Sequence, residues 1–248
     1  MRKDMTQPVA WALALVAVLT ISMSASAATL TGFAQANPTS PADLTALSVG
    51  GDWAIWTDTS DPRPDGEPDN RKDNVAPLIG DVSALIDAQG EVRGVGTAST
   101  QHFTYSDGLV SPFSVGDVQP SGVTDDTLST FGQGVALDIT GDPSQVLFVR
   151  LFVAGFRATG NLTATLNNTA GYSDNSFSWA ETKTGRLYLL AFQPDSVGDL
   201  LHIEYSASGV GGSGHVLLSA VTVAVPTPAS LPAGLGLLSL ITLRRRRR

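Results

Sequence analysis

Alternating apolar and polar residues predict a series of β-strands in the second half of the chain. From Val135 onward, apolar residues recur at every second position in short runs bounded by Gly, Asn, Asp and Pro. This pattern is typical of strands that bury one face. The predicted strands are residues 135–139, 146–153, 161–167, 187–192, 200–205 and 216–223, with a glycine-rich turn at residues 209–214. Their regular spacing indicates an antiparallel sandwich.

Two of these runs differ in how many faces they bury. Residues 146–153 are apolar on both faces apart from Arg150, as expected for a strand at the centre of a sandwich. Arg150 points the same way as Phe148 and Phe152, so we expect its stem to lie over aromatic rings; a ligand-binding guanidinium is the alternative. Residues 161–167 instead alternate apolar residues with Thr and Asn, so one face is expected to meet solvent.

The first half of the chain predicts fewer elements. Residues 44–49 predict a short helical turn, and residues 51–56 predict an early strand that carries Trp53 and Trp56. Aromatic rings stack on the apolar faces of sugars, so both are candidate ligand contacts, with core packing as the alternative. Trp179 is a third candidate because it follows polar residues in a predicted loop at 172–180; capping the sandwich is its alternative role.

The first 27 residues have the pattern of a secretory signal peptide. Met1-Arg2-Lys3 is positively charged, residues 9–21 form an apolar run, and Ala25 and Ala27 are small residues at alternate positions. This order predicts export and cleavage after Ala27. A permanent membrane anchor is disfavoured because the apolar run is short.

Residues 225–248 predict a second targeting segment. Val225-Pro226-Thr227-Pro228-Ala229 is expected to be extended, because proline lacks a donor and biases its predecessor away from helix. The apolar residues 229–243 would rise about 22 Å as a helix, against a hydrocarbon core of ~30 Å. Five arginines follow and favour a cytoplasmic end. We therefore expect a transient anchor that holds the body outside the cytoplasm.

This order of VPTPA peptide, short hydrophobic helix and arginine tail resembles the C-terminal sorting signal of PEP-CTERM proteins of the VPxPA type. The resemblance implies an exosortase as partner, in a Gram-negative bacterium that makes exopolysaccharide. It implies transient anchoring in the inner membrane and delivery from the periplasm to the outer surface or extracellular matrix. An ordinary tail anchor is the alternative. The chain is thus divided into a signal peptide (1–27), a body (28–224) and a sorting signal (225–248).

The charge and the cysteine content of the body exclude several classes of partner and site. Seven of the 15 basic residues and one of the 23 acidic residues lie in the two signals. The body therefore has 8 basic and 22 acidic residues, which gives it a formal charge of −14. Nucleic-acid phosphates repel such a surface, so no nucleic-acid partner is expected. The chain has no cysteine, which excludes disulfides, thiol catalysis and cysteine metal sites.

The body also resembles a family of exported bacterial modules. Asp52-Trp53-Ala54-Ile55-Trp56, Arg71-Lys72, residues 103–108 and residues 151–166 follow an order similar to modules with a galactose-binding-like jelly roll. The resemblance covers roughly residues 50–223 and implies an all-β fold, an antiparallel β-sandwich of jelly-roll type. Such modules often accompany carbohydrate-active domains, which makes extracellular polysaccharide a candidate partner.

An acidic loop is the candidate metal site. Asp58, Asp61, Asp65 and Asp69 provide carboxylate oxygens, which suit the relaxed coordination of a structural Ca²⁺. The loop lacks the spacing of an EF-hand. Its three prolines and interleaved basic residues favour the alternative, a solvated loop without a cofactor.

No residue pattern indicates catalysis. His102, His202 and His215 are scattered, and we interpret His202, beside Glu204, as part of a solvated strand face. The resemblance of the C-terminal segment to a sorting signal, together with this absence, leads us to expect a non-enzymatic exported surface or matrix protein that interacts with exopolysaccharide. One alternative is a polysaccharide-processing hydrolase, which needs two carboxylates facing each other in a cleft. The other is a purely structural surface or biofilm-matrix protein without a small ligand.

Overall fold

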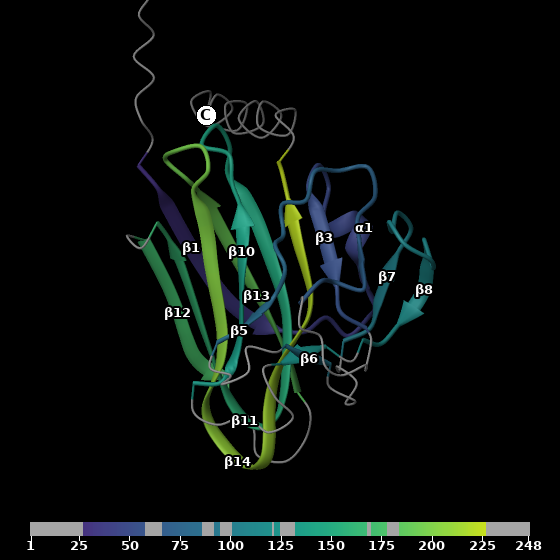
Figure 1. The fold of residues 1–248 in the computed structure, drawn as a ribbon, viewed down its shortest axis with the longest axis vertical. Helices are drawn as coiled ribbons and strands as arrows, with labels where there is room; N and C mark the ends of the chain where they lie inside the picture. Colours follow the sequence, from purple (N-terminus) through teal and green to yellow (C-terminus); the bar gives the residue numbers. More distant parts are fainter. Residues whose placement is uncertain are drawn as a thin grey trace, which may run out of the picture.

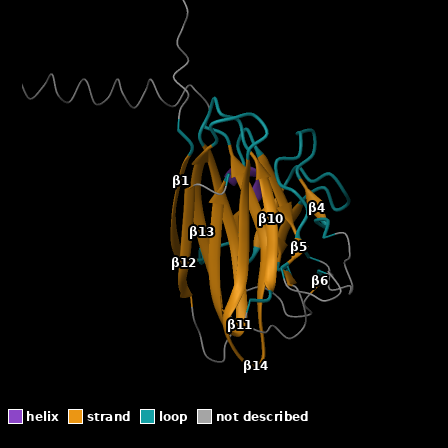
Figure 2. Ribbon diagram, turned by 60° about the vertical axis from the view of Figure 1, so that its left-hand side comes forward, coloured by secondary structure: helices purple, strands orange, loops and turns teal. Residues whose placement is uncertain are grey.

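The computed structural model describes residues 27–57, 66–85, 92–94, 101–120, 122–124, 132–167, 170–177 and 184–226. Within them almost all regular structure is strand, so the all-β prediction is confirmed. Most strands form one large antiparallel sheet that curls on itself (Figures 1 and 2). They are β1 (Thr29–Ala36), β3 (Asp52–Ile55), β4 (Asn70–Arg71), β5 (Ser83–Ala84), β6 (Arg93–Gly94), β9 (Val123–Thr124), β10 (Gly134–Thr140), β11 (Leu147–Leu166), β12 (Ala170–Phe177), β13 (Thr184–Gln193) and β14 (Leu200–Ala224).

The long strands β11 and β14 form an antiparallel pair that bends in the middle. They pair from Phe148 opposite Ala224 to Leu166 opposite Leu201, with register shifts along the way. Along residues 147–155 β11 also pairs with β13, and the facing part of β14 pairs with β3. Along residues 160–166 β11 also pairs with β12, and the facing part of β14 pairs with β10. The β11–β14 pair therefore has two arms. We call residues 147–155 with 216–224 the first arm, and residues 160–166 with 200–207 the second arm.

Glycines permit this bend, and they explain a wrong prediction. The sequence predicts a turn at residues 209–214 between two strands, but β14 runs through this stretch as one strand. The predicted strands 146–153 and 161–167 likewise belong to a single strand, β11. Strands bend most easily where glycine replaces a side chain. At Gly214 a Cβ atom would lie 2.2 Å from the Arg157 carbonyl oxygen, so the bend requires glycine there.

The strand β12 lies where the sequence predicts a loop, at residues 172–180. Its half-buried Tyr172 and Asp174 alternate with exposed Ser173 and Asn175. Among the described strands β12 pairs only with β11, so it is an edge strand. Edge strands tolerate polar residues because water reaches them. The apolar alternation that predicts the other strands is therefore missing here.

The main core fills the space between the two arms. Tyr188 of β13 and Tyr205 of β14 meet there from opposite arms, with ring centroids 6.4 Å apart. Each fully buried large apolar side chain contributes about 1.5–3 kcal/mol, so this core is a principal source of stability in a chain without disulfides. The β11 residues in this core are Leu147, Val149, Leu151, Val153, Ala158, Leu162, Ala164 and Leu166.

A second core lies on the outer face of the first arm. It is covered by a small sheet of β2 (Ala42–Asp43), β7 (Phe103–Tyr105) and β8 (Val115–Val118), and by helix α1 (Leu44–Leu47), which confirms the predicted helical turn. The Phe103 and Phe152 rings meet edge to face at 5.0 Å. This cover buries Phe152 on the outer face of β11, whereas Val146 and Phe148 on the same face are exposed. Arg150 donates a hydrogen bond to the Leu47 carbonyl oxygen at 3.0 Å.

The chain enters and leaves the curled sheet at one end. Thr29, the first residue of β1, pairs with Gln193, the last residue of β13. In the neighbouring rows Leu147 pairs with Phe192, and Phe148 pairs with Ala224, the last residue of β14. We call this the exit end; it includes the loops 141–146 and 194–199 (Figure 1). The opposite end, around residues 155–160 and 208–214, is the bend end.

Candidate functional site

Three neighbouring strands bring polar side chains together on the outer face of the second arm. Thr165 of β11, His202 of β14 and Asp138 of β10 occupy one row across the sheet. Their neighbours along each strand are apolar and point into the main core. Because successive residues of a strand face opposite ways, the hydrophobic pattern that builds the core also directs these three polar groups to solvent.

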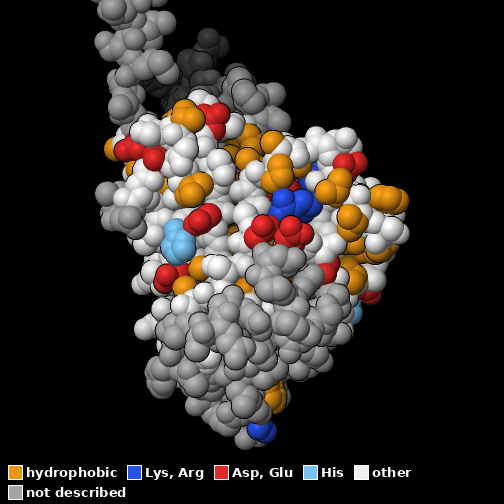
Figure 3. Space-filling view, viewed as in Figure 1, with side chains coloured by type: hydrophobic (Ala, Val, Ile, Leu, Met, Phe, Trp, Pro, Cys, Tyr) orange, Lys and Arg blue, Asp and Glu red, His pale blue; other side chains and the backbone are white. Residues whose placement is uncertain are grey.

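His202 is held between two carboxylates. Its Nδ1 lies 2.7 Å from Oδ1 of Asp138, and its Nε2 lies 3.4 Å from Oε1 of Glu204. Partial burial lowers the pKa of the imidazole, but the hydrogen bonds and charges of Asp138 and Glu204 outweigh burial, so the pKa is raised above its ordinary value. The protonated ring donates to both carboxylates. Figure 3 shows a histidine between acidic side chains on this face.

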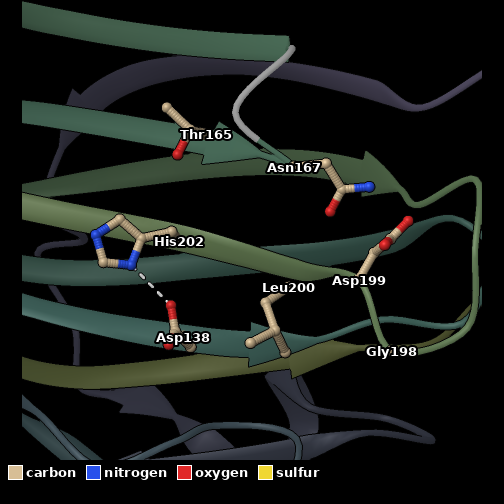
Figure 4. A pocket seen from close by; sticks show the side chains of 7 residues that line it. All are labelled: Asp138, Thr165, Asn167, Gly198, Asp199, Leu200 and His202. Atoms are coloured by element: carbon tan, nitrogen blue, oxygen red, sulfur yellow. Dashed lines mark hydrogen bonds and ion pairs between the residues drawn. The ribbon is translucent and has the colours of Figure 1, made fainter.

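A pocket of about 320 Å³ adjoins this histidine (Figure 4). His202 and Asp138 lie at one end of it, Asn167 and Asp199 lie at the other, and Leu200 lies between them. The Asn167 amide is the chief cause that lowers the pKa of Asp199. We call this site the His202 pocket; its lining residues are Asp138, Thr165, Asn167, Gly198, Asp199, Leu200 and His202.

The groups of the His202 pocket suit a hydroxyl-rich ligand. Carboxylates accept hydrogen bonds from hydroxyls, an amide both donates and accepts, and an apolar side chain packs against C–H groups. Within the described residues no group of three or more His, Asp or Glu is arranged to hold a metal ion. The Nε2 atom of His202 faces the Glu204 carboxylate, so the ring is not placed to activate Thr165 as a nucleophile.

A second pocket, of about 330 Å³, lies beside the predicted acidic loop. The Asp69 carboxylate accepts a hydrogen bond from the Thr57 backbone, and Arg71 lies 3.8 Å from Asp81. Asp58, Asp61 and Asp65 lie outside the described residues, so the calcium site stays a prediction. The lining residues of this pocket are Glu67, Pro68, Asp69, Asn70, Arg71, Asp81, Leu109 and Val110.

The structure places Trp53 and Trp56 in different cores, both fully buried. The Trp53 ring lies 4.6 Å from the Tyr105 ring in the second core, and its Nε1 donates to Asp107 Oδ1 at 2.8 Å. Trp56 belongs to the main core, and its Nε1 donates to the Gly66 carbonyl oxygen at 3.2 Å. Both side chains therefore pack in a core, which is the alternative that the sequence left open to ligand contact. Trp179 lies outside the described residues.

Only the start of the predicted sorting motif belongs to the described residues. Val225 packs against the main core, and its N–H donates to the Val49 carbonyl oxygen at 3.0 Å. Pro226 is the last described residue and Ala27 the first, so Thr227, Pro228, Ala229 and Ala25 lie outside. The described residues contain no helix of the length and apolarity that crossing a membrane requires. The signal and sorting assignments stay predictions.

Sequence reasoning identifies the face of His202 but not its partner across the sheet. The alternation of Leu201, His202 and Ile203 predicts an outward ring, and the His202 side chain is indeed 44% exposed. Asp138 lies 64 positions away in the sequence and comes into contact only through the register of β10 and β14. The available signal was weak: each of the two residues is a polar interruption at an outward position of an apolar strand.

Comparisons with known proteins give no match. No family model matches the chain, and no curated protein or solved structure matches it either. The resemblances to PEP-CTERM proteins and to galactose-binding-like modules therefore rest on the sequence motifs alone. Function is inferred from those motifs and from the geometry of the His202 pocket.

Proposed function

We propose that this chain is an exported, non-enzymatic protein of a bacterial cell surface or extracellular matrix, sorted by an exosortase-type enzyme. The signal-peptide pattern at residues 1–27 supports export. The VPTPA motif, apolar segment and arginine tail at residues 225–248 support transient anchoring in the inner membrane. Both segments join the body at its exit end, so a single membrane can hold them together.

The body is proposed to bind exopolysaccharide through the second arm. The observation that carries this proposal is the His202 pocket, where Asp138, Asn167 and Asp199 offer hydrogen bonds around the apolar Leu200. The described strands of the second arm contain no Lys or Arg. A polyanionic glycan would therefore be repelled, whereas a neutral or amino-bearing polysaccharide complements the site.

The body is also proposed to be a variant of the galactose-binding-like jelly roll. In support, the two arms of the curled sheet pack face to face around one core, as the two sheets of a sandwich do. The strands of both arms are antiparallel, which is the pairing that jelly rolls use.

A panel of neutral, amino-bearing and anionic polysaccharides tests the ligand. Asp138→Asn and His202→Gln should each weaken binding of the preferred glycan roughly tenfold or more, because a hydrogen bond to a charged group contributes about 1.5–3 kcal/mol. Asp117→Asn is the matched control, since Asp117 forms a contact of the same length, 2.7 Å, with His102 elsewhere on the surface.

The outcomes separate the three functions. Binding that is weakened by the two pocket variants and unaffected by the control supports a carbohydrate-binding protein. Absence of binding to every polysaccharide would leave a purely structural surface protein. Release of reducing sugars by the wild-type protein, lost in Asp138→Asn, would instead indicate a hydrolase.

A further inference from the structure

Large apolar side chains stand exposed at the exit end. Val197, at the tip of the loop between β13 and β14, is 88% exposed. Exposed large apolar side chains that gather in one region of a protein commonly mark a contact site. The exposed apolar residues at this end are Val49, Val146, Phe148, Val197 and Leu200. Phe148 and Leu200 lie on the outer faces of opposite arms, so they surround the end, and Leu200 also lines the His202 pocket.

The same end carries the start of the apolar tail. The body is fixed up to Val225 by the hydrogen bond to Val49, and Pro226 follows directly. Residues 229–243 form the apolar run, so three residue steps separate Pro226 from its first residue. Even a fully extended chain spans at most about 11 Å over three residues. A membrane that holds the tail therefore lies close to the exit end.

We propose that the exit end docks on the bilayer surface while the tail is membrane-bound, with the Val197 loop reaching the interfacial region. This inference rests on the proposed function, because it needs the tail to enter a membrane. The short tether keeps the apolar side chains at a high local concentration relative to the lipid. The docked body then presents the bend end away from the membrane.

Charge specifies the kind of lipid surface. The loops at the exit end contain Asp142, Asp195 and Asp199, and their described residues include no Lys or Arg. Anionic headgroups therefore do not attract this end. Docking relies on apolar contact with zwitterionic lipid and on the tether, and the body released from its tail is expected to leave the membrane.

Single-cysteine labelling tests the contact in the full chain. The sequence has no cysteine, so Val197→Cys provides one defined site for an environment-sensitive fluorophore. Thr184→Cys is the matched control. Thr184 is exposed and is the first residue of β13, the strand that leads into the Val197 loop, but it lies at the bend end. Both labelled proteins are bound to phosphatidylcholine vesicles whose acyl chains carry a quencher near the headgroup.

The expected result is blue-shifted, strongly quenched emission at position 197 and water-like, unquenched emission at position 184. Water-like emission at both positions in a vesicle-bound chain would overturn docking and leave tail anchoring intact. Disulfide-linked dimers of the unlabelled Val197→Cys chain would assign the surface to a second copy and also overturn the proposal. A chain that fails to float with the vesicles would overturn tail anchoring itself, and docking with it.

Discussion

Asp107 joins three segments through one carboxylate. Its Oδ1 accepts hydrogen bonds from the Trp53 indole at 2.8 Å and the Thr45 hydroxyl at 2.5 Å, and its Oδ2 lies 3.8 Å from the Lys72 ammonium. These partners belong to β3, to α1 and to the residue after β4. The Trp53 ring is fully buried, so its N–H depends on Asp107 for an acceptor.

Replacing Asp107 by alanine should therefore lower the free energy of unfolding by about 1–3 kcal/mol, the cost of a buried donor left without a partner. Urea denaturation followed by tryptophan fluorescence measures this loss. Asp81→Ala is the control: Asp81 is half-exposed, lies 3.8 Å from Arg71, and should change stability by at most ~1 kcal/mol. Equal effects of the two substitutions would contradict the role assigned to Asp107.

His202 gives the protein a defined pH dependence. Its pKa is raised in the folded state, with the hydrogen bonds and charges of Asp138 and Glu204 exceeding the effect of partial burial. The stabilisation by its protonated ring is therefore fully present below the ordinary histidine pKa of about 6.5 and is lost as pH rises through the higher folded-state pKa.

Asp138→Asn should lower the folded-state pKa of His202. The free energy of unfolding should then decrease less as pH rises above about 6.5. An NMR titration of the His202 ring, with urea midpoints at each pH, measures both effects. Asp117→Asn should leave the His202 titration unchanged, because Asp117 contacts His102 instead. An unaltered His202 titration in Asp138→Asn would refute the pairing.

At the scale of elements, the sequence predicts strands well where they border a core. The alternation in β10, β11, β13 and β14 arises because each strand buries at least one face. The polar edge strand β12 leaves no such pattern. Glycine is ambiguous, since it marks both turns and bends, so two predicted strands at residues 200–205 and 216–223 prove to be one bent strand.

Because of the bend, we expect alanine substitutions at two glycines of the sheet to differ strongly in their effect on stability. Gly214→Ala should lower the free energy of unfolding by about 1–3 kcal/mol, because the new Cβ would lie 2.2 Å from the Arg157 carbonyl oxygen and the backbone must shift. Gly171→Ala in β12 is the control, because the new Cβ would lie 3.7 Å from its nearest neighbour across the sheet, the Ala164 carbonyl oxygen. Thermal unfolding of both variants decides the point; a neutral Gly214→Ala would argue against the bend.

The candidate site was harder to predict than the strands. Alternation places Asp138, Thr165 and His202 on outward faces, yet nothing in the sequence tells which strands are neighbours. Their row exists because β14 lies between β11 and β10 in the second arm. Trp53 and Trp56, the more conspicuous candidates, are both buried because the small sheet and the curl of the large sheet cover both faces of β3.

For the whole molecule, the last strand of the body is a central one. β14 pairs with β11, β10, β3 and β9, so both arms depend on residues 200–224. Neither core can close before this strand is available, which suits the proposed export, in which the chain would cross a membrane unfolded and fold afterwards. The predicted sorting motif begins at the next residue, Val225, and so becomes available together with the completed fold.

The two prolines of the motif test the sorting proposal in cells. Proline keeps a peptide extended and removes a backbone donor, so Pro226→Ala combined with Pro228→Ala should impair cleavage and leave a tail-bearing form in the inner membrane. Immunoblots of fractionated cells distinguish this form from the released body. Pro143→Ala, in a loop of the exit end, should be processed like the wild type. Normal release of the double variant would argue against exosortase sorting, whereas the curled sheet, whose cores lie upstream of Pro226, would be unaffected.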